Sequence, residues 1–150
     1  MTNKEFFIKN WQDEARVTAK AFRALPDDKS KLNYKHHPKL RSPWEIVNHI
    51  ISWRETVLKR INGENIESPD DNYFSFIRDR SENSWQKTKE RFRESQIKWL
   101  KTIKKFKSRD LDAKHDFSTF SNYELVLGIL QHDAYHLGQI RLMKKLVQLT

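Results

Sequence analysis

Apolar residues recur every three or four positions through most of the chain, the spacing that places them on one face of an α-helix. The pattern predicts four helices, at about Asn3 to Leu25, Ser42 to Asn62, Ser81 to Lys107 and Ser121 to Val147. The turn cluster Pro26-Asp27-Asp28 ends the first of them. Ser42 with Glu45, and Ser121 with Glu124, form the capping-box pattern expected where the second and fourth helices begin.

The amino-acid composition supports a helical class. Three glycines and four prolines provide little material for a turn-rich β architecture, whereas nine Phe, five Trp and four Tyr can fill a core. We expect an all-α protein with one domain over residues 1–150, built as a four-helix bundle.

The same composition limits location and chemistry. No apolar run approaches roughly 18 residues and no basic-then-apolar leader opens the chain, so we expect neither a membrane span nor a secretory signal. The absence of cysteine excludes disulfides, thiolate ligands and a thiol nucleophile, and it fits a cytoplasmic protein.

Two histidines stand four residues apart in the last predicted helix, His132 and His136. They lie on its apolar stripe, whose other members are Leu125, Ile129, Ile140, Met143 and Val147. Both imidazoles therefore point inward, where an unpaired polar ring costs roughly 1–3 kcal/mol. The pair is either hydrogen-bonded in the core or bound to a shared metal ion. The spacing alone decides for neither, because chance gives it roughly 0.2 times per chain of this composition.

Any third protein ligand must come from upstream, because the 14 residues after His136 contain no histidine, cysteine, aspartate or glutamate. The zinc-protease motif HExxH has the same histidine spacing, but Asp133 stands where that motif has its glutamate base. His49 falls on the inward stripe of the second predicted helix, with Ile46, Ile50, Trp53, Val57 and Ile61. We therefore expect His49, His132 and His136 to be the metal ligands.

The sequence NHI around His49 and the pattern H-x-x-x-H-x-G-Q-I from His132 to Ile140 resemble the DinB/YfiT-like superfamily. The resemblance extends over essentially the whole chain in helix order and length. It implies a four-helix bundle with a crossover between the second and third helices. It also implies a divalent metal, commonly nickel or zinc, bound by the three histidines. Gly138 and Gln139 match the G-Q pair of the family.

The resemblance also implies an activity, because members with a known reaction are chiefly transferases or isomerases that use a low-molecular-weight thiol such as bacillithiol or mycothiol. Some members are homodimers. Apart from the family, three neutral imidazoles leave coordination positions open, and a metal there lowers the pKa of a bound water or thiol. A histidine-only ligand set does not separate zinc, nickel, iron and copper.

We therefore expect a metal-dependent thiol S-transferase or a hydrolase acting on a small electrophilic substrate, with no catalytic residue assigned. Because the chain has no cysteine, a thiol would have to come from outside as a cosubstrate. The connection after Gly63 is short, so we expect it to contribute little to a substrate pocket.

Three polar side chains are spaced to contact the ligand rings: Glu45 one turn before His49, Asp133 three residues before His136, and Gln139 three residues after it. Glu45 can equally be only a helix-cap partner, and Gln139 can simply fix helix packing. Asp133 has the strongest case, because it lies close to the apolar stripe and a buried carboxylate needs a partner.

The remaining histidines, His36, His37 and His115, lie in polar segments where we expect exposure to solvent. The alternative for the adjacent pair His36-His37 is an adventitious surface metal site.

Positive charge is concentrated in the third predicted helix. Of the net charge of +9, the segment Arg78 to Arg109 supplies +8, from 12 basic and four acidic residues. Such a face can bind phosphates of nucleic acid or attract an anionic small substrate. Its aromatic residues fall on the inward stripe, so we expect a solvated basic surface rather than a base-stacking one. The alternative function is a non-enzymatic bundle, with a structural metal or none, whose basic helix binds a polyanion.

Overall fold

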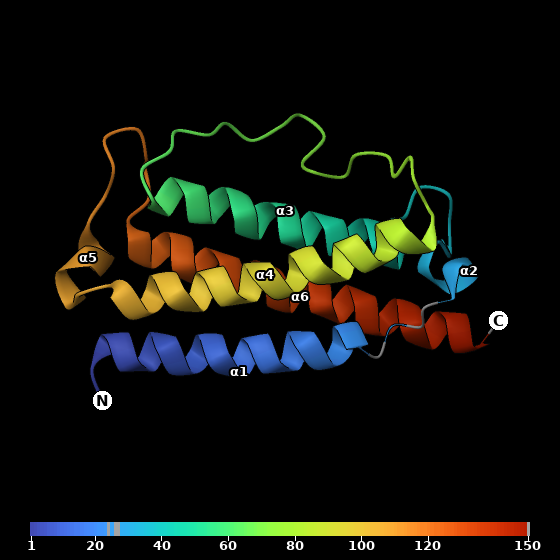
Figure 1. Cartoon of the computed structure of the whole chain (residues 1–150), viewed down its shortest axis with the longest axis horizontal. Coiled ribbons are helices and arrows are strands. Elements are labelled where there is room, and N and C mark those ends of the chain that lie inside the picture. The colour runs from blue at the N-terminus through green and yellow to red at the C-terminus, as the bar shows by residue number, and fades with distance from the viewer. Residues whose placement is uncertain (24, 26–27, 150) are drawn as a thin grey trace.

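Helices make up the regular structure of this protein, and the computed structural model describes residues 1–23, 25 and 28–149 (Figure 1). The helices are α1 (Asn3–Arg23), α2 (Lys29–Leu32), α3 (Pro43–Ile61), α4 (Glu82–Lys105), α5 (Ser108–Asp112) and α6 (Asn122–Leu149). No strand occurs within those ranges, so the expected all-α class is confirmed. In the same part of the chain, every helix is too short or too polar to cross a bilayer.

The four long helices confirm the predicted ones to within two residues at each described end. The cluster that was predicted to stop the first helix falls partly on Pro26 and Asp27, which lie outside the described residues. The pattern missed α2 and α5, because one or two helical turns carry no periodicity. Each instead buries a single leucine, Leu32 in α2 and Leu111 in α5.

The long helices form a bundle in which α1 and α6 run in one direction and α3 and α4 in the other (Figure 1). Helix α3 packs on α4 and α6, and α1 packs on the same two helices, so α1 and α3 occupy opposite corners. Because α3 and α4 are parallel, the chain must travel back along α3 before α4 begins. Residues 62–81 make that return as an extended crossover, as the family resemblance implied.

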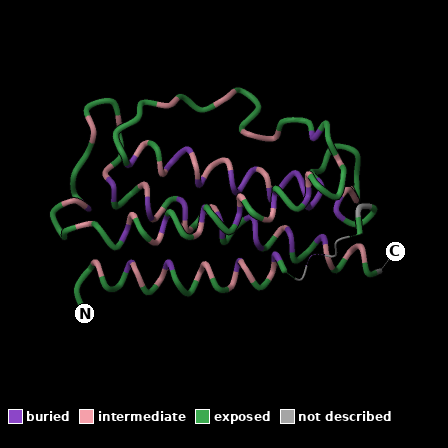
Figure 2. The backbone as a smooth tube through the Cα atoms, viewed as in Figure 1, coloured by how far each residue is buried: buried purple, intermediate pink, exposed green. Residues whose placement is uncertain are grey.

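Buried residues line the inward sides of the long helices (Figure 2). They form two apolar clusters, one around Trp44, Trp85 and Phe92 and one around Trp11 and Trp99. Between the two clusters, the middles of α3, α4 and α6 contribute buried polar groups. The core is therefore two apolar halves separated by a polar layer, and this layer lies beside the predicted ligands.

The ends of α3 are defined by local hydrogen bonds. At its start, Ser42 accepts from the backbone N–H of Glu45, while the Glu45 carboxylate accepts from Ser42, which completes the predicted capping box. At its end, Gly63 takes a positive φ of 93°, a conformation that suits glycine best, and reverses the chain into the crossover.

The other histidines are divided between surface and structure. His36 and His37 are exposed as expected. The expectation for His115 was wrong, because its ring is partly buried and its Nε2 donates to the backbone oxygen of Ile61 at 2.9 Å. The ring also stacks on Phe117 and lies beside Gly63. His115 thus caps the last turn of α3, a contact between residues 54 positions apart that the local sequence does not reveal.

Candidate metal centre

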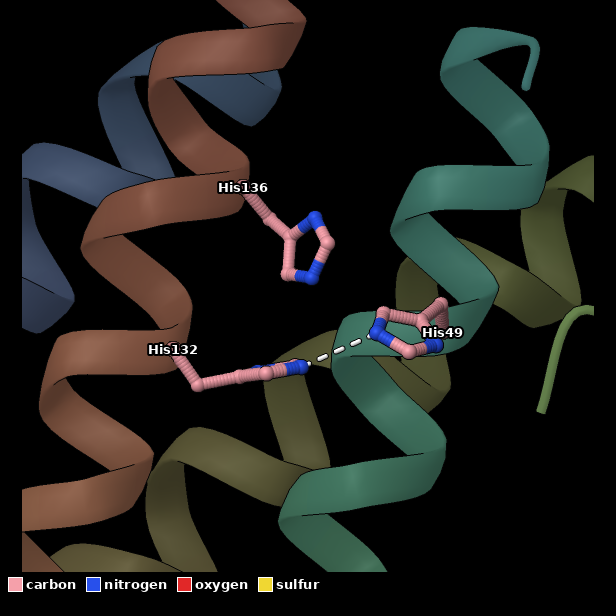
Figure 3. Close-up of side chains that lie close together, drawn as sticks. All are labelled: His49, His132 and His136. Carbon is pink, nitrogen blue, oxygen red and sulfur yellow. Dashed lines mark hydrogen bonds between the residues drawn. The ribbon is translucent and has the colours of Figure 1, made fainter. Parts of the chain in front are cut away.

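Three imidazole rings meet between α3 and α6 (Figure 3). His49 projects from the second turn of α3, and His132 and His136 project from successive turns of α6 because they stand four residues apart. One nitrogen from each ring lies within 4.8 Å of the other two. The structure therefore brings together the three residues that the sequence analysis selected.

A backbone carbonyl fixes the protonation of His49. Its Nδ1 lies 2.7 Å from the carbonyl oxygen of Asn72, which can only accept, so Nδ1 carries the hydrogen and donates. The ring is buried and stacks on Phe74, with centroids 3.9 Å apart and planes 5° from parallel. The lone pair of His49 is consequently on Nε2, the nitrogen that faces the other two rings.

His136 is oriented in the same way by a side chain of its own helix. Its Nδ1 lies 2.7 Å from Oε1 of Gln139, three residues further along α6. Donation from Nδ1 to this amide oxygen leaves the lone pair of His136 on Nε2. The ring edge also contacts Tyr135. Two of the three rings thus keep Nε2 free, as ligation through that nitrogen requires.

The surroundings of His132 give a test of whether a metal fits. Its Nε2 lies 2.9 Å from Nε2 of His49, close to the roughly 3.0–3.4 Å expected for two nitrogens held about 2.1 Å from one ion. On the opposite side of the ring, Nδ1 is buried 3.6 Å from Oδ1 of Asp133. Neither of those two atoms has a hydrogen-bond partner within the described residues.

These two atoms, His132 Nδ1 and Asp133 Oδ1, attract each other when His132 Nδ1 carries a hydrogen that points toward the carboxylate. Nε2 is then either a second protonated nitrogen or the ligand of a cation. Three ring nitrogens directed at one point favour the cation, because one proton can serve only two of them. The donor set therefore fits a divalent metal ion.

An ion pair that the sequence analysis missed holds Asp133. Arg54 Nε and Nη2 each lie 2.6 Å from Asp133 Oδ2, and both side chains are 0 % exposed. Arg54 also donates to Ser95 at 3.3 Å and lies over the rings of Trp11 and Phe92. A buried charge survives only with such a set of partners. The sequence signal was an arginine within the apolar stripe of α3, four residues after Ile50.

Glu45 is engaged elsewhere. Besides its cap contact, its carboxylate binds the ammonium of Lys35 at 3.0 Å, and the Nδ1 hydrogen of His49 goes to Asn72 instead. Glu45 therefore matches the helix-cap alternative that its sequence position left open.

Burial keeps two of the three rings neutral. Desolvation, reinforced by the neighbouring His136 and opposed by the bond to Asn72, lowers the pKa of His49 from 6.5 to about 4. Desolvation also lowers the pKa of His136, although its bond to Gln139 acts in the opposite direction. Neutral imidazole is the form that binds a metal, so burial prepares these rings for ligation near pH 7.

The rings open into a cavity of about 610 Å³. Its walls come from α3, α6, the crossover and the connection between α5 and α6, and they include Trp53, Val57, Phe120, Leu125, Ile129 and Tyr135. The expectation that the connection after Gly63 contributes little to a pocket was wrong, because Ser68 and Asn72 of the crossover line this cavity. Parallel helices force the connection to pass over the rings, a constraint that its length alone does not show.

The comparisons with known proteins agree with this fold. A sequence model of the DinB superfamily matches residues 10–140. The crystal structure of a DinB-like protein from Bacillus cereus ATCC 10987 superposes with a TM-score of 0.72 at 16% sequence identity, covering 96% of this chain and 92% of that one. The comparison with curated proteins found no match.

We expect Asp133→Asn to lower the free energy of unfolding by about 3–5 kcal/mol, because it leaves the Arg54 cation buried without a counter-charge. The double variant Arg54→Met with Asp133→Leu should lose much less, since it removes both charges from the same apolar surroundings. Urea denaturation of the metal-free proteins measures both. A loss below about 1 kcal/mol in Asp133→Asn would show that the pair is not the buried contact described above.

Stability of the metal-free protein should fall as the pH drops from about 6.5 to about 4. Over that window an unfolded His49 takes up a proton and the folded one does not, because its folded pKa is about 4. The unfolded state then binds more protons than the folded state, so the free energy of unfolding rises with pH. Above about pH 6.5 His49 is neutral in both states and no longer affects that free energy. The expected change is on the order of 2 kcal/mol.

Comparison with His49→Gln isolates this effect from the carboxylates that titrate in the same range. The variant should show a shallower dependence of unfolding free energy on pH. Equal slopes for the two proteins would contradict the assignment.

Proposed function

The chain belongs to the DinB superfamily, and on that premise we propose that it is a metal-dependent enzyme whose ligands are His49, His132 and His136. The proposed reaction joins a low-molecular-weight thiol to a small electrophile, with hydrolysis as the alternative use of the same site. The observation that carries the proposal is the convergence of three ring nitrogens, two of them freed by hydrogen bonds on the opposite side of their rings.

The protein residues supply orientation and a dry environment. Asn72 and Gln139 hold His49 and His136 with Nε2 free, while the Arg54–Asp133 pair places a carboxylate behind His132. Phe74 covers the ring of His49. A bound divalent ion supplies a Lewis acid that lowers the pKa of a coordinated thiol or water.

The thiol must come from outside, since the chain contains no cysteine. In the proposed transfer, a sulfur–carbon bond forms as the bond between that carbon and its leaving group breaks, and the thiol proton is released to solvent. Three histidine ligands leave positions open for such a cosubstrate, and nickel and zinc are the metals we propose.

Metal content is the first test. The protein is purified without a polyhistidine tag, and bound metals are measured by mass spectrometry for the native chain and for His49→Ala, His132→Ala and His136→Ala. We expect about one ion per native chain and its loss in each variant, since two histidines bind far more weakly than three. His37→Ala, which removes an exposed histidine outside the site, should retain the ion.

Activity is measured on the same proteins as metal-dependent consumption of cysteine or glutathione with 1-chloro-2,4-dinitrobenzene, and as hydrolysis of 4-nitrophenyl acetate. Loss of both rates in the three site variants, with retention in His37→Ala, supports the proposal. Absence of metal after reconstitution with nickel and zinc would refute it.

A second candidate function, polyanion binding, rests on the exposed lysines of α4. Its lysines at 87, 98, 101, 104 and 105 are exposed, whereas Trp85, Phe92 and Trp99 are buried as the pattern predicted. Bases therefore have no aromatic surface on this helix to stack on, and any polyanion would bind through phosphate contacts alone.

Such binding should weaken steeply between 50 and 200 mM salt and should fall in the double variant Lys101→Glu with Lys105→Glu. Fluorescence anisotropy with a labelled DNA duplex measures it. A salt-independent affinity, or none at 50 mM, would reject this second function.

A further inference from the structure

The cavity does not end at the three histidines. It continues along α3 to Arg60, which stands 11 residues after His49 and therefore about 16 Å further along the helix axis. Between these ends the walls are largely apolar, with Trp53 and Val57 on one side and Leu125 on the other. One end thus offers metal ligands, the middle offers apolar contact, and the far end offers a cation.

The guanidinium of Arg60 is held in place. Its Nε and Nη2 donate to the backbone oxygen of Ile66 at 2.9 and 2.6 Å, and Nη2 also donates to Ser68 at 3.1 Å. The group lies over the ring of Trp53, 5.6 Å from its centre. These contacts immobilise the side chain before any ligand arrives, which lowers the entropy cost of binding.

Among the described residues, no acidic side chain neutralises the charge of Arg60. Its partners are a carbonyl and a hydroxyl, and it forms no ion pair with a carboxylate in that part of the chain. Those contacts use Nε and Nη2 and leave Nη1 for a ligand. A guanidinium fixed in this way suits the oxygens of a carboxylate.

Glu124 also lines the cavity, but it has a different role. Its exposed carboxylate accepts from the backbone N–H and hydroxyl of Ser121 at the start of α6. These bonds lower the pKa of Glu124, so it stays negative at neutral pH. Its presence near the cavity disfavours ligands with several negative charges and therefore favours a single anionic group.

Gly128 keeps the middle of the cavity open. It lies inside α6, where glycine destabilises a helix by roughly 0.5–1 kcal/mol relative to alanine. Packing does not require it, because an added Cβ would meet nothing within 4 Å. It lines the cavity one turn before His132, so any larger side chain here would project into the space between the rings and Arg60.

We propose that Arg60 is an anion-binding subsite, and that the molecule taken by this cavity is elongated and largely apolar with one carboxylate at the end remote from the histidines. The proposal deepens the proposed function, because it names the substrate class of the same site. The anion subsite itself requires no metal, so its test is independent of metal binding.

The test uses decanoate and its neutral isostere decanamide, titrated calorimetrically into the metal-free protein. The native chain should bind decanoate about tenfold more tightly than decanamide, the difference expected for a charge-assisted contact. Arg60→Gln should abolish this preference by weakening decanoate binding about tenfold while changing decanamide binding less than twofold. Lys59→Gln removes the same charge from the neighbouring, exposed position and should preserve the preference.

A further variant tests the path between the two ends. Gly128→Phe should weaken binding of both probes while the metal content after reconstitution stays near one ion per chain, since it fills the cavity without altering a ligand.

Three results would overturn the proposal: no binding of either probe, equal affinity of the native protein for both, or an equal loss for both in Arg60→Gln. An equal loss for both probes would mean that Arg60 only holds the crossover in place. Failure of metal binding would refute the enzyme proposal and leave the calorimetric comparison intact, so the two failures are distinguishable.

Discussion

The fully buried ion pair between Arg54 and Asp133 is the contact on which the rest of this structure depends. Two charges without solvent exposure are tolerated only with close partners, and here the carboxylate, Ser95 and two aromatic rings surround the guanidinium. The pair joins the middle of α3 to the middle of α6, and Ser95 adds α4. Because Asp133 is adjacent to His132 and Arg54 follows His49 by five residues, this contact sets the register that brings the rings together.

The crossover supports the same rings from outside the bundle. Asn72 presents its carbonyl to His49, and its side chain accepts from the indole N–H of Trp53 at 3.0 Å. Asn72 and Tyr73 both adopt positive φ, 51° and 58°, a region that a tyrosine rarely occupies. Tyr73 is anchored by its hydroxyl to Thr56 at 2.6 Å. Strain of this kind persists where the surroundings impose it. Here it lies at Asn72, whose carbonyl determines the tautomer of His49, and at the adjacent Tyr73.

These two supports differ in their chemistry. The Arg54–Asp133 side is buried and charged, the crossover side is a loop, and the cavity extends from the rings to Arg60. Ile66 and Ser68, which hold Arg60, belong to the same crossover as Asn72, so one segment positions both ends of the cavity. A change in the path of this segment would alter ligand orientation and the cation together. The arrangement couples the proposed metal centre to the proposed anion subsite without direct contact between them.

Much of the fold and the histidine cluster follows from local sequence. The three-and-four periodicity determined the four long helices and placed His49, His132 and His136 on inward faces, because burial on a helix depends on spacing along one segment. The contacts that give the cluster its chemistry were decided by the tertiary structure. Asn72 meets His49 from 23 residues away, and Arg54 meets Asp133 from 79 away. Arg60 faces a cavity only because parallel helices send the crossover over it. Such contacts depend on the path of the chain between elements, which no periodicity within an element encodes.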